Sequence, residues 1–136
     1  MSAIVYAQEQ TLGAEDYIAV VGSTYMAERR PVGNVERVRR ILTGSNMIVT
    51  ARQDGKIVGV LRGISDGEWV CYVADLAVHP EHQGKGIGTG LLRKCKDLLG
   101  PGMGIVLVAY PEAVEYYRKI GMGEMPAFYF DREIRT

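Results

Sequence analysis

The chain has 136 residues, 47% of them hydrophobic and 24% charged, and its 16 basic and 16 acidic side chains leave a net charge of zero. This length fits one domain, expected to span residues 1–136, and is too short for two domains of ordinary size. A net charge of zero argues against a dedicated nucleic-acid or membrane-surface binder, because such proteins carry a basic excess. No apolar run approaches the roughly 18 residues of a membrane span and no secretory signal is visible, so we expect a cytoplasmic protein. Cys71 and Cys95 show no zinc or redox spacing, which suits a reducing compartment.

The first half of the chain predicts two helices followed by an antiparallel meander. Residues 2–7 are expected to form a short strand, and apolar side chains recur at helical spacing over residues 16–25. Asn34 is a suitable N-cap for a second helix that ends at Leu42. Two Asp-Gly pairs, each a signal for a tight turn, then separate three strands. These strands are expected at Met47–Gln53, Lys56–Ser65 and residues 69–78.

The second half predicts a crossover unit. A glycine-rich turn leads into a helix over residues 86–99, and the continuous apolar run at residues 105–109 is typical of a strand covered on both faces. A short helix is expected between Pro111 and Gly121, and residues 127–132 are expected to form a final strand. The order βααβββαβαβ predicts the α/β class, with a mixed central sheet flanked by helices, in which an antiparallel meander precedes a βαβ crossover.

The turn before the helix at residues 86–99 has the chemistry of an anion site. Alternate glycines follow a strand that ends at Val78. Glycine lets main-chain N–H groups approach a ligand closely, and a helix N-terminus adds partial positive charge, so the turn suits a phosphate. The dinucleotide fingerprint GxGxxG fails at Thr89, and a P-loop fails because Gly86 follows Lys85 where Ser or Thr is required.

The motif Gln83-x-x-Gly86-x-Gly88, placed after a strand that carries Leu76-Ala77-Val78, resembles a signature of the GNAT family of acyl-CoA-dependent N-acetyltransferases. The resemblance covers residues 69–99, resumes at residues 112–122 and accounts for the order of the elements.

This resemblance implies acetyl-CoA as the co-substrate. Main-chain N–H groups of residues 83–89 would hold the CoA pyrophosphate, and main-chain groups of Leu76 and Val78 would hold the pantetheine arm. Family members also splay the sheet here, which leaves an N–H near the thioester carbonyl to stabilise the developing charge. The implied cofactor-binding residues are Leu76, Ala77, Val78, Gln83, Gly84, Lys85, Gly86, Ile87, Gly88 and Thr89.

Residues 112–122 resemble the second signature of the family, in which a tyrosine on a short helix reprotonates the CoA thiolate as it leaves. Tyr117 occupies the tyrosine position, and Tyr116 stands where phenylalanine is usual. Tyr117 is therefore the implied general acid. The residues also allow both tyrosines to pack the core, because they lie on an apolar helical stripe. We favour the core role for Tyr116 and the catalytic role for Tyr117.

The general base is not evident. Several family members place Glu or His where Tyr72 and Ala74 stand here, so a direct base at those positions is not supported. Asp75 is the nearest strand carboxylate and the second expected catalytic residue. It either binds the amine, relays protons through water or supports the local bend of the strand. Glu28 is a further candidate, because the segment around the first two helices lines the acceptor pocket in this family.

The turn after Glu28 also holds Arg29 and Arg30, which either meet a carboxylate on the acceptor or remain solvated. No metal is expected, since His79 and His82 have no further ligand at a suitable offset. The expected substrate-binding residues are Glu28, Arg29, Arg30 and Tyr72.

The resemblance implies an enzyme that moves an acetyl group from acetyl-CoA to a primary amine by direct attack in a ternary complex, since no activated Ser or Cys is evident. The short chain favours a small-molecule acceptor over a protein N-terminus or lysine. The alternative is a non-catalytic acyl-CoA-binding module or a partner subunit. Family members often pair through late strands, which implies a homodimer with Phe128-Tyr129-Phe130 as an apolar contact, and neither nucleic acid nor a membrane is an expected partner.

Overall fold

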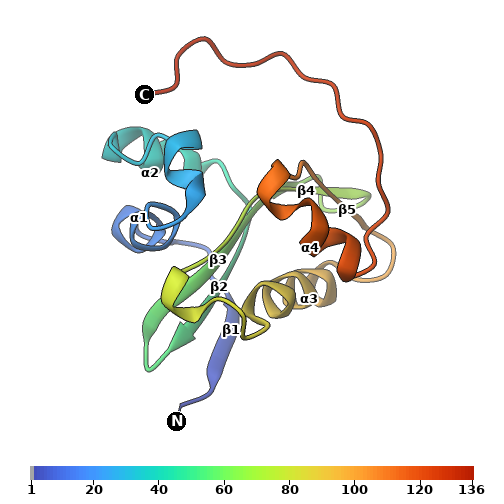
Figure 1. Cartoon of the computed structure of the whole chain (residues 1–136), viewed down its shortest axis with the longest axis horizontal. Helices are drawn as coiled ribbons and strands as arrows, with labels where there is room; N and C mark the ends of the chain where they lie inside the picture. Colours follow the sequence, from blue (N-terminus) through green and yellow to red (C-terminus); the bar gives the residue numbers. More distant parts are fainter. Residues whose placement is uncertain (1) are drawn as a thin grey trace.

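The computed structural model describes residues 2–136, and Met1 of the expected domain lies outside the described residues. Its strands form one five-stranded sheet in the order β1-β2-β3-β4-β5, with helices on both faces (Figure 1). The strands are β1 (Ile4–Gln8), β2 (Met47–Gln53), β3 (Lys56–Ser65), β4 (Val70–Val78) and β5 (Gly104–Leu107). The helices are α1 (Ala14–Val21), α2 (Val35–Thr43), α3 (Ile87–Leu99) and α4 (Val114–Lys119), with short 3-10 helices η1 (Tyr25–Arg29), η2 (Pro80–His82) and η3 (Pro111–Ala113).

The sheet is mixed. Strands β1 to β4 pair antiparallel with their neighbours, whereas β4 and β5 pair in parallel. Helix α3 makes the crossover between β4 and β5, which is the βαβ unit expected after the meander. The α/β class and the mixed-sheet architecture predicted from the sequence are therefore confirmed.

Local sequence signals set several of the turns and caps. Asp54 and Gly55 both have positive φ, 52° and 79°, which is the backbone of the type I′ turn that joins β2 to β3. The side chain of Asn34 accepts a hydrogen bond from the N–H of Arg37 and so caps α2. The second helix therefore begins after the predicted cap, Asn34, and the meander turns at the predicted Asp-Gly pair.

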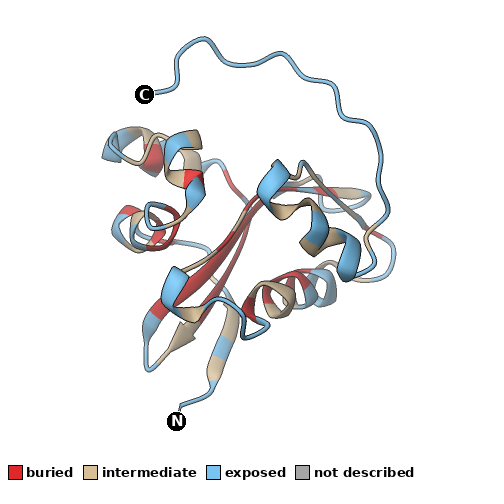
Figure 2. Ribbon diagram, in the orientation of Figure 1, coloured by how far each residue is buried: buried red, intermediate tan, exposed pale blue. Residues whose placement is uncertain are grey.

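Apolar side chains form a core on each face of the sheet. On one face, Tyr17 of α1 and Val38 of α2 pack with Val60 of β3. On the other face, Leu91 of α3 packs with Leu61 of β3. Figure 2 shows the buried central strands between these helices. Because a slip of one residue would exchange the two faces, burial on both sides fixes the strand register.

The expected final strand at residues 127–132 is wrong. Residues 123–136 run as an extended chain that pairs with no strand of the described residues and ends beside α2, where Arg37 donates to the carbonyl of Ile134 (Figures 1 and 2). Phe128 and Phe130 are 93% and 104% exposed. Their β-propensity produces no strand here because a strand needs a partner strand beside it.

Strand β5 also differs from the expectation of a strand covered on both faces. It ends at Leu107, two residues before the apolar run at residues 105–109 ends. Ile105 and Leu107 pack toward α3, whereas Val106 on the opposite face is 49% exposed. β5 is therefore an edge strand with one covered face.

Candidate active site

Strand β4 presents an open edge over its second half. Its pairing with β5 stops at Val73, whereas its pairing with β3 continues to Val78. The N–H of His79 donates to the carbonyl of Val58 on β3, and main-chain groups alternate in direction along an antiparallel strand. The N–H and C=O groups of Leu76 and Val78 therefore point away from β3, toward the open edge.

A β-bulge lies just before this edge. Arg62 pairs with Asp75, but the next residue, Gly63, pairs with Val73, so Ala74 has no opposite residue on β3 within the described sheet. Pairing with β5 also stops at this point. The bulge and the early end of β5 together splay the sheet, as the family resemblance implies.

The glycine turn ends at the N-terminus of α3. Gly84 and Gly86 have φ values of 79° and 80°, a left-handed backbone that favours glycine. Gly86 is the N-cap and contributes no side chain, and the first helical bond runs from the N–H of Gly90 to the carbonyl of Gly86. The N–H groups of residues 87–89 thus have no helical acceptor, and together with the helix dipole they have the chemistry that suits a phosphate group.

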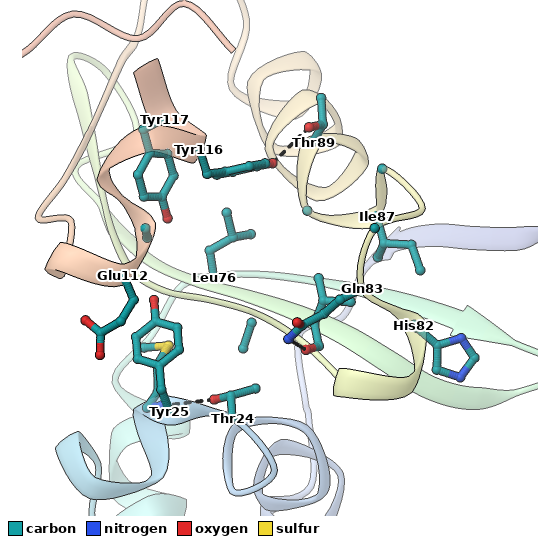
Figure 3. Close-up of a pocket in the computed structure, with 17 residues that line it drawn as sticks. Thr24, Tyr25, Leu76, His82, Gln83, Ile87, Thr89, Glu112, Tyr116 and Tyr117 are labelled. Carbon is teal, nitrogen blue, oxygen red and sulfur yellow. Dashed lines mark hydrogen bonds between the residues drawn. The ribbon is translucent and has the colours of Figure 1, made fainter. Parts of the chain in front are cut away.

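One cavity of about 340 Å³ joins the glycine turn to the open edge of β4 (Figure 3). The expected general acid, Tyr117, lines this cavity. At the edge itself, the side-chain amide of Gln83 donates to the carbonyl of Val78 at 3.0 Å. Lys85 is exposed and lies outside the lining. The other expected cofactor-binding residues all line the cavity, namely Leu76, Ala77, Val78, Gln83, Gly84, Gly86, Ile87, Gly88 and Thr89.

The two neighbouring tyrosines of α4 have different surroundings. The hydroxyl of Tyr116 lies 2.8 Å from Oγ1 of Thr89, and a Cβ on Gly88 would lie only 3.0 Å from it. The hydroxyl of Tyr117 points into the cavity, and no side chain within residues 2–136 hydrogen-bonds to it (Figure 3). Burial raises the pKa of Tyr117, so the phenol stays protonated at neutral pH. Tyr116 is tied to α3, whereas Tyr117 is available to a ligand.

Asp75 does not line the cavity. It is 1% exposed, and its carboxylate accepts hydrogen bonds from Nε of Arg30 at 2.6 Å and from Nε of Arg62 and the hydroxyl of Tyr17, both at 2.5 Å. Burial alone would raise the pKa of Asp75, but Arg62 and Arg30 outweigh it and hold that pKa below its usual value. This geometry favours support of the local bend over contact with a substrate amine.

The expected substrate-binding residues also lie outside the lining of the main cavity. Glu28 and Tyr72 are exposed at the surface. The guanidinium of Arg29 lies over the ring of Tyr110, 4.2 Å from its centroid, and forms an ion pair with Glu112 at 3.0 Å. Arg30 is engaged with Asp75. None of the four expected substrate-binding residues therefore lines the main cavity.

Segment η1 supplies cavity residues that the sequence pattern misses. The expected first helix ends at Val21 rather than at Tyr25, and η1 then brings Tyr25 and Met26 against β4. Figure 3 shows the hydroxyls of Tyr25 and Tyr117 pointing toward one another across the cavity. A 3-10 turn that follows the C-cap glycine of a helix, here Gly22, has no strong sequence signal. The apolar spacing over residues 16–25 therefore predicts a longer helix than the one observed.

Glu112 is a further cavity residue that the sequence analysis leaves out. It precedes Tyr116 by four residues, and this spacing could have placed both on one helical face. A hydrogen bond from its own main-chain N–H and the side chain of Arg29 hold the pKa of Glu112 below its usual value. Glu112 therefore carries a carboxylate at the rim of the cavity at neutral pH, where it pairs with Arg29.

Residues 2–136 contain neither a metal-binding cluster nor a membrane-spanning helix. No group of three or more His, Cys, Asp or Glu side chains in this range is arranged to hold a metal ion. None of the helices described is long and apolar enough to cross a membrane.

Known proteins are similar to this chain in sequence and in fold. Serotonin N-acetyltransferase 2, a chloroplastic protein of Oryza sativa subsp. japonica, is 34% identical over 110 residues, which cover 72% of this chain and 55% of that protein. The chain spans about half the length of the curated relatives it matches.

Two solved structures show the same fold. A GNAT-family acetyltransferase from Streptococcus pneumoniae TIGR4 is similar with a TM-score of 0.75 and 23% identity, covering 96% of this chain and 100% of that one. An aminoglycoside N-acetyltransferase in complex with CoA is similar with a TM-score of 0.72 and 15% identity, covering 98% of this chain and 96% of that one.

The family model of the GNAT acetyltransferases matches residues 14–122, a stretch that contains β4, the glycine turn and α4. These elements line the cavity together with η1 and η3. Acetyl-CoA is the acetyl donor of this family, as the sequence predicts. The chain therefore belongs to the GNAT family of acetyltransferases.

Proposed function

We propose that the chain is an N-acetyltransferase, one domain over residues 1–136 that moves the acetyl group of acetyl-CoA to the primary amine of a small molecule. The amine attacks directly within a ternary complex. The observation that carries this proposal is the single cavity that joins the glycine turn, the open edge of β4 and the hydroxyl of Tyr117. These features suit, in that order, the pyrophosphate, the pantetheine amides and the thioester of an acyl-CoA.

Main-chain groups do most of the cofactor binding in this proposal. The N–H groups of residues 83–89 hold the pyrophosphate, and the outward-pointing groups of Leu76 and Val78 pair with the pantetheine amides as an added strand would. The bond from Gln83 to the carbonyl of Val78 supports this, because it shows that this carbonyl accepts a donor from the open side. The exposed ammonium of Lys85 adds positive charge near the phosphates.

The reaction forms one bond and breaks one. The amine nitrogen bonds to the acetyl carbon, negative charge develops on the carbonyl oxygen, and an outward main-chain N–H such as that of Leu76 stabilises this charge. The C–S bond then breaks, the sulfur leaves with the electron pair as a thiolate, and the thiolate takes a proton. From an ammonium substrate the products are the acetamide, the CoA thiol and one proton.

Two side chains complete the chemistry. Tyr117 donates a hydrogen bond and then its proton to the departing sulfur, and its raised pKa keeps the phenol protonated until that step. Glu112 is the single acidic side chain that lines the cavity within the described residues. As a carboxylate it attracts the ammonium form of the acceptor, and water carries the released proton away.

Two relatives support a small amine as the acceptor. One is named for serotonin and another for aminoglycosides, and both names denote small amines rather than proteins. Cys71 and Cys95 are free and buried, which supports a reducing compartment, and we place the protein in the cytoplasm.

We also propose a homodimer. The outer edge of β5 has no neighbouring strand within residues 2–136, and the tail residues Phe128 and Phe130 are exposed. A second copy that laid its tail against this edge would bury both.

Thermal unfolding with acetyl-CoA, free CoA or NADH tests the cofactor. Ligand at a hundredfold excess over its Kd adds about 2.7 kcal/mol of stability, which raises the Tm by several degrees. We expect a shift with acetyl-CoA and CoA but none with NADH. Release of CoA thiol with a panel of small amines then tests the transfer. Absence of a shift contradicts the cofactor assignment, and a shift without thiol release leaves the non-catalytic acyl-CoA-binding module.

A further inference from the structure

The guanidinium of Arg30 is almost fully engaged. Its Nε donates to Oδ1 of Asp75 at 2.6 Å, and its Nη2 donates to the carbonyl of Ala74 at 2.7 Å. Its Nη1 donates to the carbonyl of Arg29 at 2.6 Å and to the hydroxyl of Tyr110 at 3.1 Å. Four of the five N–H groups are thereby used, so Arg30 retains no two-pronged face for an acceptor carboxylate.

Two of these bonds hold the bulge of β4. Ala74 is the residue that the bulge leaves without an opposite residue on β3, and β5 pairing ends one residue earlier. Its carbonyl is accordingly outside the regular ladders, and Arg30 supplies its donor. The direction of the chain at this position is therefore fixed by the side chain of Arg30, the residue that caps η1, rather than by a neighbouring strand.

Asp75, which accepts from Arg30, is itself held by residues of β3 and α1. Its second oxygen accepts from Arg62 of β3 and Tyr17 of α1, and Arg62 also donates to the hydroxyl of Ser45 at 3.1 Å. A buried carboxylate is costly to desolvate, and removal of one of its partners would leave an uncompensated buried charge, so the contacts of Asp75 with Arg62 and Tyr17 hold it in place. Arg30 thus joins a rigid anchor to the half-buried η1 segment.

The residue after this anchor lies where the reaction would occur. Leu76 lines the main cavity, and it also lines an adjoining cavity of about 20 Å³ together with Ala74. Tyr25 and Met26 of η1 line both cavities as well. The junction of the two cavities therefore lies between the bulge and η1, the two elements that Arg30 ties together.

We propose that Arg30 is a positioning residue for acetyl transfer, which holds the bulge at Ala74 and Asp75 so that the N–H of Leu76 is aimed at the thioester carbonyl. This inference rests on the proposed function. It replaces the expectation that Arg30 binds the acceptor. Catalysis by an oriented N–H is sensitive to small displacements, because a shift of about 1 Å can cost about a hundredfold in rate.

The test compares Arg30→Lys with the control Arg40→Lys, since Arg40 is an exposed residue of α2 remote from the cavity lining. Arg30→Lys keeps the charge but loses the fork that grips Ala74 and Asp75 together. We expect kcat to fall about 10- to 100-fold while KM for acetyl-CoA changes less than about threefold, because the glycine turn is intact. Amide hydrogen exchange should accelerate in residues 73–78 and stay unchanged in α3. Arg40→Lys should match the wild type in all three measurements.

A second variant keeps the test decisive if Arg30→Lys does not fold. Tyr110→Phe removes one acceptor of the Arg30 guanidinium, and it should lower kcat in the same direction by a smaller factor. If the wild type turns over an amine and a folded Arg30 or Tyr110 variant keeps its full kcat, the positioning role is wrong and the proposed function stands. If the wild type binds acetyl-CoA but acetylates no amine, the transferase function fails and the positioning role fails with it.

Discussion

The ring of Tyr117 packs edge to face on the ring of Tyr116, with centroids 5.2 Å apart and an interplanar angle of 70°, yet only Tyr116 is hydrogen-bonded, to Thr89. The pair therefore forms a matched set for testing the general acid. We expect Tyr117→Phe to lower kcat about a hundredfold with KM for acetyl-CoA nearly unchanged, because the phenol acts on the leaving thiolate. Tyr116→Phe should lose about 1 kcal/mol of stability and keep most of its kcat. Equal kcat values for the two variants would remove the acid role of Tyr117.

The backbone of the glycine turn gives a prediction for cofactor binding. Gly86 has a φ of 80° at the N-cap of α3, where an L side chain is strained by about 1–3 kcal/mol. Gly86→Ala should therefore weaken acetyl-CoA binding and reduce the Tm shift that saturating acetyl-CoA gives the wild type. Gly102→Ala is the control, since no atom lies within 4 Å of its added Cβ and its φ is not positive. The same ligand-induced Tm shift in both variants would argue against a pyrophosphate at this turn.

Glu112 gives a prediction that separates the acceptor from the cofactor. Glu112→Gln keeps the shape of the side chain and removes the carboxylate charge from the cavity. KM for the amine should rise about three- to tenfold, since a charge-assisted hydrogen bond at a partly exposed site is weakened. KM for acetyl-CoA should not change. Glu115→Gln is the control, because Glu115 lies on the adjoining helix α4 and outside the cavity lining. Initial-rate kinetics with both substrates varied decide the outcome. An unchanged amine KM would exclude Glu112 as the ammonium partner.

The buried cluster around Asp75 predicts how stability depends on pH. The pKa of Asp75 is lowered in the folded protein, so this carboxylate contributes stability that is fully present above its unfolded pKa of about 3.9. That contribution is lost as the pH falls through the lower folded pKa, and the loss begins below about pH 5. Asp75→Asn should reduce stability at pH 7 by about 3–5 kcal/mol, because Arg62 and Arg30 lose their counter-charge.

Urea unfolding of the wild type and Asp75→Asn between pH 3 and pH 7 measures this effect. The free energy of unfolding should fall more steeply toward pH 3 in the wild type than in Asp75→Asn. Parallel pH profiles for the two proteins would show that Asp75 does not contribute the expected proton linkage.

The sequence predicts the strands and turns that carry the site better than it predicts the side-chain contacts around the cavity. Hydrophobic periodicity and the two Asp-Gly turns predict the meander, and the glycine turn predicts the anion site, because these signals depend on neighbouring residues alone. The burial of Asp75 depends on Arg30 and Arg62, which lie 45 and 13 residues away along the chain. Contacts of this kind arise only when the fold brings distant segments together, so they cannot be predicted from the spacing of residues in the sequence.

Glu112 shows an intermediate case. Its position four residues before Tyr116 was available in the sequence, but its place in the cavity depends on the approach of η1 to η3, where Arg29 pairs with Glu112. The strand expected at residues 127–132 fails for a related reason. Its residue pattern is typical of a strand, but within the described chain no strand lies beside it.

The exposed tail gives the last prediction. Phe128 and Phe130 are both almost fully exposed, and they would share one face if the tail paired as a strand, since alternate side chains of a strand point the same way. Such aromatic exposure is costly in water, and the open edge of β5 offers unpaired main-chain groups that an added strand would satisfy. If a second copy covers them, the wild type should elute with twice the mass of one chain in light-scattering chromatography. Phe128→Ser with Phe130→Ser should then shift the protein to the monomer, whereas Glu133→Gln, an exposed tail residue, should leave the dimer intact. A wild type that remains monomeric at high micromolar concentration would refute the homodimer, and the tail would then be covered, if at all, by something other than a second copy of this chain.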